Sequence, residues 1–276
     1  MDFELQRIVQ AALREDIGTG DVTTLSTVDP ATVSQAELVA KEEFVQAGIE
    51  VAERVFSTLD PDISFEALVA DGQAVKRGDV LAWIKGPAAI LLQGERVALN
   101  FLQRMSGIAT LTAAFVREIE GTGATIVDTR KTMPGLRLLD KYAVRAGGGT
   151  NHRTSLYDGV LIKENHIRAA GGVKAAIERA RKRIPHTLKI EIETTALEEV
   201  SEALEAGADI IMLDNMGLKQ MEDAVALVDG KAQTEASGGI NLETVRAIAE
   251  TGVDLISVGA LTHSSRAVDI SMLFES

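Results

Sequence analysis

A stretch of 41 residues, from Asp128 to Arg168, gathers the side chains best suited to bind an anion. It contains eight lysines and arginines against four acids, although the whole chain of 276 residues carries a formal charge of −13. A polyanion binder usually carries positive charge over its whole surface, so this local concentration favours a small anionic ligand over nucleic acid. The cations are Arg130, Lys131, Arg137, Lys141, Arg145, Arg153, Lys163 and Arg168.

The sequence AGGGTNHR within this stretch places three consecutive glycines before a histidine and an arginine. Three glycines exceed what a helix end needs, so we expect a loop that presents Arg153 to a carboxylate. A planar guanidinium can bind a carboxylate through two parallel hydrogen bonds, which an ammonium cannot do. We expect His152 beside it as a further donor. We assign no role to His166, and we expect His186 and His263 to be surface residues.

Two carboxylates, Glu193 and Asp214, follow two neighbouring apolar runs and are expected to face each other at the mouth of one site. Oxygen ligands of this kind suit Mg²⁺, which takes few protein oxygens and completes its shell with substrate oxygens. They would also stabilise a developing positive charge. The alternative is that they form interior ion pairs with Lys189, Lys163 or Arg130, and the two interpretations can hold in different states of the site.

Small residues follow the last two apolar runs, as Ser237-Gly238-Gly239 and as Val258-Gly259-Ala260. Small side chains let a phosphate approach the backbone N–H groups, and a nearby helix N-terminus favours its charge. The last two strands of a βα barrel are a common position for a phosphate. A tight turn alone would also explain paired glycines, but their position after both runs favours a phosphate site.

The elements that must position these residues form a repeated pattern from residue 124 onward. Short apolar runs alternate with amphipathic helices, which indicates a parallel βα array. Such an array closes as a barrel or lies open as a doubly wound sheet; we favour the barrel, because polar residues end nearly every strand and barrel strand ends converge on one face. The predicted strands are Ala124–Val127, Gly159–Ile162, Leu188–Ile192, Asp209–Leu213, Thr234–Ala236 and Leu255–Val258, and the predicted helices are Gly172–Arg183, Ala196–Ala206, Leu218–Val228 and Leu242–Glu250.

The first part of the chain mixes helices and strands. Residues 15–24, EDIGTGDVTT, are expected to form a loop, and residues 70–87 read as strand, turn, strand within a small β-sandwich. The latter segment is similar to lipoyl- or biotinyl-type modules, but it lacks the hairpin lysine that such a module modifies. The predicted elements are helices Leu5–Arg14, Ile49–Leu59 and Leu91–Ser106, which carries Arg104, and strands Ala36–Lys41 and Ile63–Val69.

Composition limits the class of protein. Apolar residues make up 46% of the chain and charged residues 25%, which is typical of a globular protein with a normal core. Cysteine is absent, which excludes a disulfide framework, a thiolate metal site and a cysteine nucleophile. No apolar run approaches the roughly 20 residues that span a bilayer, and the acidic start does not resemble a signal peptide. We therefore expect a cytoplasmic protein.

Taken together, these segments resemble the quinolinate phosphoribosyltransferase family, also called nicotinate-nucleotide pyrophosphorylase (carboxylating). The resemblance lies in DTRKTMPGLRLLDKYAVRAGGGTNHR, LIKENHI, IEIE, MLDN, EASGGI and SVGALTHS, and also in EDIGTGDVTT and ERVALNFLQRMSGIATLT. It covers almost the whole chain in the right order. It implies an incomplete α/β barrel, residues 111–276, after an open α/β-sandwich domain, residues 1–110, with a C-terminal tail that packs back on the first domain. It also implies a homodimer or larger homo-oligomer with sites shared between subunits.

The resemblance further implies a reaction and a set of residues. The reaction transfers the phosphoribosyl group of phosphoribosyl pyrophosphate to quinolinate with decarboxylation, giving nicotinate mononucleotide, pyrophosphate and CO₂ with Mg²⁺ in NAD biosynthesis. Catalysis would involve Lys131, Lys163, Glu193 and Asp214, with the two carboxylates near Mg²⁺. The substrate-binding residues implied are Arg104 from the neighbouring subunit, Thr129, Arg130, Lys131, His152, Arg153, Lys163, Glu193, Asp214, Ser237, Gly238, Gly239, Val258, Gly259 and Ala260.

Two other functions fit part of the sequence. Molybdenum-transport accessory proteins resemble this family and share segments like DTRKT and GGG-HR, although we expect them to lack the full series NHR to LIKENH. A phosphate-binding barrel enzyme that acts on another anionic substrate would explain the glycine turns but not the cation cluster. Neither nucleic acid nor a membrane is an expected partner.

Overall fold

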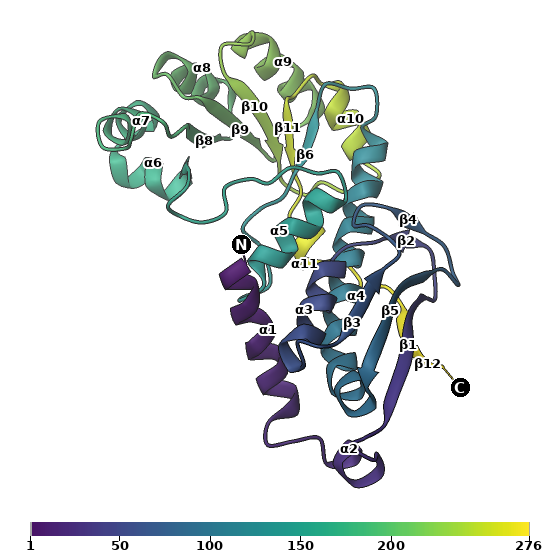
Figure 1. The fold of residues 1–276 in the computed structure, drawn as a ribbon. Helices are drawn as coiled ribbons and strands as arrows, with labels where there is room; N and C mark the ends of the chain where they lie inside the picture. The colour runs from purple at the N-terminus through teal and green to yellow at the C-terminus, as the bar shows by residue number, and fades with distance from the viewer. Residues whose placement is uncertain (1, 276) are drawn as a thin grey trace. The chain divides into compact units, whose positions relative to one another are not determined.

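The computed structural model describes residues 2–275 and divides them into two compact units (Figure 1). The first unit is built from residues up to 113, residues 132–148 and residues from 264 onward. The second unit contains residues 114–131 and 149–263. The boundary predicted between residues 110 and 111 falls inside helix α4 (Ala88–Glu118), which is longer at both ends than the predicted helix Leu91–Ser106.

The first unit contains a four-stranded antiparallel sheet in the order β12-β1-β5-β3. Its last strand along the chain, β12, pairs with β1, so that Ala36 lies opposite Phe274 and Ala40 opposite Ile270. The segment expected to form a small β-sandwich is divided between two sheets, because β4 pairs with β2 and β5 joins the larger sheet. The strands are β1 (Val33–Ala40), β2 (Phe44–Val45), β3 (Ser64–Ala67), β4 (Ala74–Val75), β5 (Val80–Pro87) and β12 (Ile270–Phe274).

Among the described residues, five helices lie wholly or partly in the first unit. They are α1 (Asp2–Ile17), α2 (Val22–Thr27), α3 (Ile49–Leu59), α4 and α5 (Arg137–Ala146). The loop predicted for residues 15–24 is shorter than expected, because α1 continues to Ile17 and α2 begins at Val22. Asp21 starts α2 as its N-cap, since its side chain accepts a hydrogen bond from the Thr24 amide at 3.0 Å. Helix α1 packs against α3.

A close backbone contact joins α4 to the C-terminal segment of this unit. A Cβ atom at Gly107 would lie 1.9 Å from the carbonyl oxygen of Arg266, so no residue with a side chain fits there without a backbone shift. The Gln103 side chain, one turn earlier, donates to the Ile270 carbonyl at 3.0 Å at the start of β12. Glycine at position 107 therefore allows helix α4 to pack closely against the backbone of this segment.

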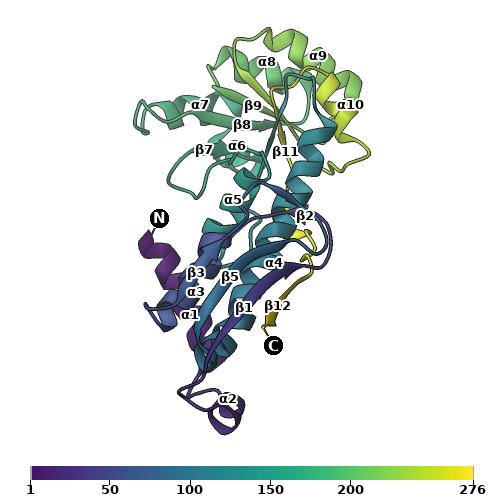
Figure 2. The same cartoon turned by 45° about the vertical axis from the view of Figure 1, so that its right-hand side comes forward.

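The second unit contains a six-stranded parallel sheet in the order β6-β11-β10-β9-β8-β7 (Figures 1 and 2). Strands β7 to β11 lie side by side in their chain order, and β6 pairs with β11. Strands β6 and β7 therefore form the two edges of the described sheet and are not paired with each other. This open seam makes the barrel incomplete, as predicted. The strands are β6 (Thr125–Val127), β7 (Val160–Ile162), β8 (Ile190–Thr194), β9 (Ile210–Asp214), β10 (Gln233–Ser237) and β11 (Leu255–Ser257).

Helices connect these strands and cover the outer face of the sheet. Helix α7 contacts β8, α9 contacts β10 and α10 contacts β11. Apolar side chains such as Ile192, Ile211 and Ala236 are completely buried, because the parallel strands are covered on the helix side. The helices are α6 (Glu164–Ala170), α7 (Val173–Arg181), α8 (Leu197–Glu205), α9 (Leu218–Val228), α10 (Val245–Glu250) and α11 (Ala260–His263). Among the described residues no helix is both long and apolar enough to cross a membrane.

Candidate active site

A cavity of about 750 Å³ opens at the carboxyl ends of the parallel strands of the second unit. Fourteen of the fifteen predicted substrate-binding residues line it, although they follow different strands and are far apart in the sequence. These are Thr129, Arg130, Lys131, His152, Arg153, Lys163, Glu193, Asp214, Ser237, Gly238, Gly239, Val258, Gly259 and Ala260. The array of parallel strands therefore brings the predicted residues together in one place.

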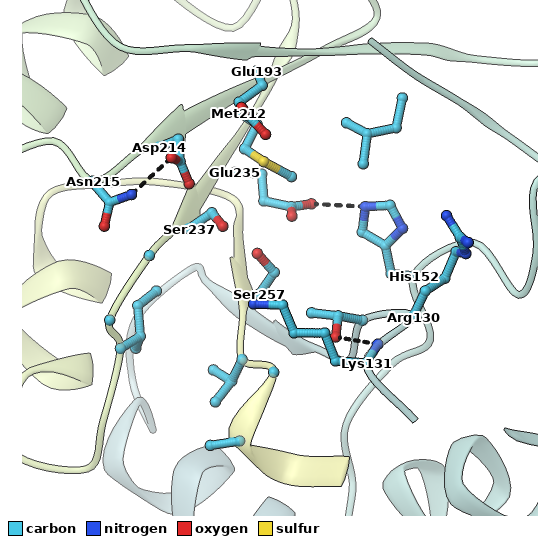
Figure 3. Close-up of a pocket in the computed structure, with 18 of the residues that line it drawn as sticks. Arg130, Lys131, His152, Glu193, Met212, Asp214, Asn215, Glu235, Ser237 and Ser257 are labelled. Carbon is cyan, nitrogen blue, oxygen red and sulfur yellow. Dashed lines mark hydrogen bonds and ion pairs between the residues drawn. The ribbon is translucent and has the colours of Figure 1, made fainter. Parts of the chain in front are cut away.

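Alternation along the strands decides which side chains enter this cavity. Met212 and Asp214 on β9 line it, as do Glu235 and Ser237 on β10, in each case two residues apart (Figure 3). The residues between them, Leu213 and Ala236, are fully buried on the opposite side. This period of two is the ordinary consequence of β geometry, and it gives the inner face of a short strand only two or three functional positions.

Asp128 fixes the loop that carries the histidine and arginine. Its carboxylate is completely buried directly after β6, where it accepts a hydrogen bond from the Asn151 side chain at 2.6 Å and one from the His152 amide at 2.9 Å. A buried carboxylate requires such donors, because it would otherwise lose its hydration without compensation. The Asp-Thr-Arg-Lys and Asn-His-Arg segments are thus held together by one buried acid.

Two guanidinium groups lie close together in the cavity wall. Burial lowers the pKa of Arg153 below its ordinary value, and the positive charge of Arg130 lowers that pKa further. The Arg153 side chain is held in place by its Nη1, which donates to the Gly159 carbonyl at 2.9 Å. Two partly buried cations that lie close together repel each other, so an anion bound between them would be strongly stabilised.

His152 uses both of its ring nitrogens within the protein. Its Nδ1 accepts a hydrogen bond from the Arg153 amide at 2.7 Å, and its Nε2 lies 2.9 Å from a carboxylate oxygen of Glu191 and 3.7 Å from one of Glu235 (Figure 3). An acceptor at Nδ1 assigns the ring proton to Nε2. In this arrangement the imidazole N–H points toward the buried acids, and not outward as the expected donor to a substrate.

The carboxyl group of Glu235 in the cavity has a strongly raised pKa. Burial raises its pKa to about 7, with a further increase from the negative charge of Glu191; His152, Ser257 and Lys163 act in the opposite direction. Only 1% of Glu235 is exposed. A perturbed carboxyl group in a cleft is typical of a functional site.

The raised pKa of Glu235 predicts a pH-dependent cost to stability. The folded state binds this proton more tightly than the unfolded state, so the cost appears as the pH rises above about 4.5 and is complete above about 7. The free energy of unfolding of Glu235→Gln, relative to that of the wild type, should therefore increase by roughly 3 kcal/mol as the pH rises from 5 to 8. Denaturant unfolding at several pH values measures this, with the exposed Glu205→Gln as control; a difference that stays constant with pH would contradict it.

Glu193 and Asp214 each have a partner in the same cavity. The Lys163 ammonium lies 2.5 Å from a Glu193 oxygen, so one of the ion pairs considered from the sequence is formed. The Asp214 carboxylate accepts a hydrogen bond from the Asn215 side chain at 2.7 Å (Figure 3). Asn215 has a positive φ of 54°, a conformation that asparagine tolerates better than most residues. A substrate that uses Lys163 or Glu193 must compete with this pair.

The two glycine turns differ in detail. Val258-Gly259-Ala260 leads directly into α11, which begins at Ala260. After Ser237-Gly238-Gly239 the next helix, α10, begins only at Val245 and not at Leu242, so the predicted helix N-terminus is farther away. Gly238 has a φ of +101°, and a Cβ atom there would lie 2.2 Å from the Asn215 side chain, whereas Gly239 faces open space. Both turns still border the cavity.

Arg104 is the one predicted substrate-binding residue that lies in the first unit. Its guanidinium makes a two-point ion pair with Asp140, through Nε at 2.9 Å and Nη2 at 2.8 Å. Asp140 is completely buried and also accepts from the Met133 amide at 3.0 Å. Arg104 therefore has a structural partner on α5, which the sequence did not reveal.

The sequence interpretation missed several residues of the site. Glu235 on β10 escaped notice because Thr234–Ala236 reads as a short apolar strand with one acid, although its spacing of two from Ser237 was an available signal. His263, expected only at the surface, is exposed but lines the cavity. His166 does not line it; it is the third residue of α6, where its Nδ1 accepts from the Lys163 amide at 3.0 Å.

An incomplete α/β barrel with clustered cations, carboxylates and glycine turns at its strand ends defines an enzyme of small anionic substrates. The chain belongs to the quinolinate phosphoribosyl transferase family: the family model for the C-terminal domain matches residues 108–273, and that for the N-terminal domain matches residues 21–106. The resemblance drawn from the sequence motifs is thereby confirmed, and so is the predicted fold class.

Curated relatives and solved structures agree with this assignment. A Bacillus subtilis (strain 168) protein named probable nicotinate-nucleotide pyrophosphorylase (carboxylating) is 47% identical over 270 residues, which cover 98% of this chain and 93% of that protein. A Nicotiana tabacum protein named quinolinate phosphoribosyltransferase (decarboxylating) 1b is 45% identical over 289 residues, covering 98% and 82%. The crystal structure of NadC from Streptococcus pyogenes has a TM-score of 0.96 at 42% identity and covers 100% of this chain and 99% of its own.

Proposed function

We propose that the chain transfers the phosphoribosyl group of phosphoribosyl pyrophosphate to quinolinate with loss of CO₂, forming nicotinate mononucleotide and pyrophosphate in NAD biosynthesis. The names of relatives that are 47% and 45% identical support this activity. The observation in the structure that carries it is the gathering of fourteen predicted residues around one cavity. None of the relatives named above is a molybdenum-transport accessory protein, so they do not support that alternative.

The cationic wall of the cavity suits the quinolinate dianion. Arg130 and Arg153 supply two neighbouring guanidinium groups, each able to bind a carboxylate through two hydrogen bonds. The Nδ1 of His152 accepts a hydrogen bond from the Arg153 amide and so holds the Arg153 backbone in place. Arg104 completes the site from the neighbouring subunit of a homodimer, which makes the active sites shared between subunits.

Other residues of the cavity suit phosphoribosyl pyrophosphate. Lys131 and Lys163 bind its phosphate groups, and Glu193 and Asp214 bind the ribose hydroxyls. The 5-phosphate is held by the turns Ser237–Gly239 and Val258–Ala260, of which Gly239 leaves open space for it. On binding, Lys163 exchanges its Glu193 partner for substrate oxygens, which compensates for the broken ion pair.

Glu193 and Asp214 also fit a role in holding Mg²⁺ together with the substrate. They are oxygen donors from neighbouring strands that border one cavity, and the pairing of β8 with β9 fixes their relative position. Hard oxygen ligands of this number match the preference of Mg²⁺ for a few carboxylates plus substrate phosphates. When bound, the ion would neutralise charge on the pyrophosphate group.

The chemistry needs positioned charge and no side-chain nucleophile. The quinolinate ring nitrogen forms a bond to ribose C1 while the C1–oxygen bond breaks and pyrophosphate leaves with that electron pair. The positive ring nitrogen then stabilises the electron pair left at C2 when the bond to the carboxyl carbon breaks, and a proton replaces the departing CO₂. The residues of the cavity align the reactants and stabilise charge, the two largest contributions to such catalysis.

Arg153→Lys should weaken quinolinate binding by about 1–3 kcal/mol, the range for hydrogen bonds to a charged group. An ammonium cannot form the two-point contact, and it also cannot keep the hydrogen bond to the Gly159 carbonyl in the same geometry. Binding of phosphoribosyl pyrophosphate should change little. Steady-state KM values for both substrates test this, with Arg168→Lys as control, since Arg168 is exposed and pairs with Glu164 on α6. Equal losses for both substrates would show that Arg153 acts structurally.

We propose a cytoplasmic location for this enzyme, as expected from the absence of cysteine and of an apolar spanning segment. The names of some plant relatives place those proteins in chloroplasts or mitochondria.

A further inference from the structure

A buried acid, Glu235, lines the cavity. Neither carboxylate oxygen of Glu235 has a hydrogen-bond partner within the described chain, although the residue borders the cavity and is 1% exposed. The Ser257 hydroxyl on β11 has one hydrogen to donate, and it lies within reach of both Glu235, whose pKa it lowers, and the Ala236 carbonyl at 3.3 Å. Met212, opposite Glu235 on β9, offers no donor. Figure 3 shows the Glu235 carboxyl group directed toward His152.

The groups that face Glu235 from the surrounding elements leave it the best place for a proton. Glu191 on β8 receives the single N–H of His152 at 2.9 Å. His152 cannot give a second hydrogen to Glu235, since its Nδ1 accepts from the Arg153 amide. Lys163, after β7, is paired with Glu193. An ionised Glu235 would therefore be a buried negative charge beside Glu191 with at most the Ser257 hydroxyl as a donor, which is costly in a low dielectric.

We propose that Glu235 is a positioning residue of the quinolinate pocket that keeps its proton while the dianion is bound, and that loss of this proton weakens quinolinate binding. The inference rests on the proposed function. Quinolinate brings two negative charges to Arg130 and Arg153. A third charge at Glu235 would compete for the same cations and would pull on His152, which holds the Arg153 backbone. When Glu235 is neutral, the positive charges of Arg130 and Arg153 interact with the substrate without this competition.

The test is the pH dependence of kcat/KM for quinolinate, measured from pH 5.5 to 9 at saturating phosphoribosyl pyrophosphate. In the wild type the value should fall above about pH 7, by up to about tenfold per pH unit for one proton, and the change should lie in KM more than in kcat. Glu235→Gln carries a permanently neutral side chain of the same shape. Its kcat/KM should show no fall of this kind between pH 6.5 and 8.5.

The outcomes separate the inference from the function on which it rests. A flat wild-type profile, or an equally steep fall in Glu235→Gln, would overturn the role of Glu235 while quinolinate turnover itself stands. If the variant does not fold, a flat wild-type profile still overturns the role of Glu235. Glu205→Gln, exposed on α8, should follow the wild type. Absence of quinolinate turnover by the wild type at every pH would overturn the proposed function and this inference together.

Discussion

Arg104→Ala and Lys163→Ala should each be nearly inactive alone, yet a mixture of the two should recover up to about a quarter of the wild-type activity. Lys163 lines the cavity of the second unit, whereas Arg104 lies in the first unit. If Arg104 serves the site of its partner subunit, a mixed dimer contains one site with both residues intact. Random exchange makes half of the dimers mixed, with one good site of two, which gives the expected quarter.

The Arg104–Asp140 ion pair makes the control essential. Removing the guanidinium leaves Asp140 buried without its main partner, and breaking a buried pair from one side typically costs about 3–5 kcal/mol. Asp140→Asn removes the same pair but keeps the Arg104 cation, so it separates lost stability from a lost ligand. Subunit exchange should be confirmed independently by labelled subunits. No recovery in exchanged mixtures would mean that Arg104 serves its own fold and not a shared site.

Nicotinate should be a very poor acceptor compared with quinolinate, although it differs only by the missing carboxyl group. Arg130 and Arg153 lie close enough for one to lower the pKa of the other, and a single carboxylate cannot satisfy both together with Arg104. A site built to pair with a polar group rejects the analogue that lacks it by about 10⁴-fold, because its own charges are left unpaired. Competition between quinolinate, nicotinate and nicotinamide in one assay measures this ratio.

The acceptor ratio also separates binding from chemistry. Nicotinate that binds well but does not react should inhibit quinolinate turnover at low concentration, whereas the unpaired cations predict weak inhibition as well as slow turnover. Comparable turnover of the two acids would show that the second carboxylate is not recognised by the cationic wall. It would then favour a barrel enzyme of broader specificity over the one proposed.

Local patterns predicted the parts of the site that depend on a single strand and its tip. Helices α3 and α9 have the bounds that periodicity alone indicated, and the polar ends of the strands met in one cavity because parallel strands share a direction. The order of motifs then identified the family. The helix bounds and the strand ends needed only the spacing of neighbouring residues, whereas the family came from a resemblance of whole motifs.

Features that depend on distant contacts were not predictable in the same way. Pairing of β12 with β1 joins residues more than two hundred positions apart, and no local pattern specifies that register. The partner of Arg104 is an acid on another helix, and the pKa of Glu235 is raised because the assembled strands bury it and place Glu191 beside it. Burial and charge at such positions are properties of the assembled barrel.

Quinolinate labelled with ¹³C separately in each carboxyl group gives the most direct test of the central claim, in the presence of phosphoribosyl pyrophosphate and Mg²⁺. The account predicts that label from the C2 carboxyl appears in CO₂ in equal amount to the pyrophosphate released, while label from the C3 carboxyl stays in nicotinate mononucleotide. Without either substrate, neither product should form. Release of pyrophosphate without CO₂, or no quinolinate-dependent pyrophosphate at all, would contradict it.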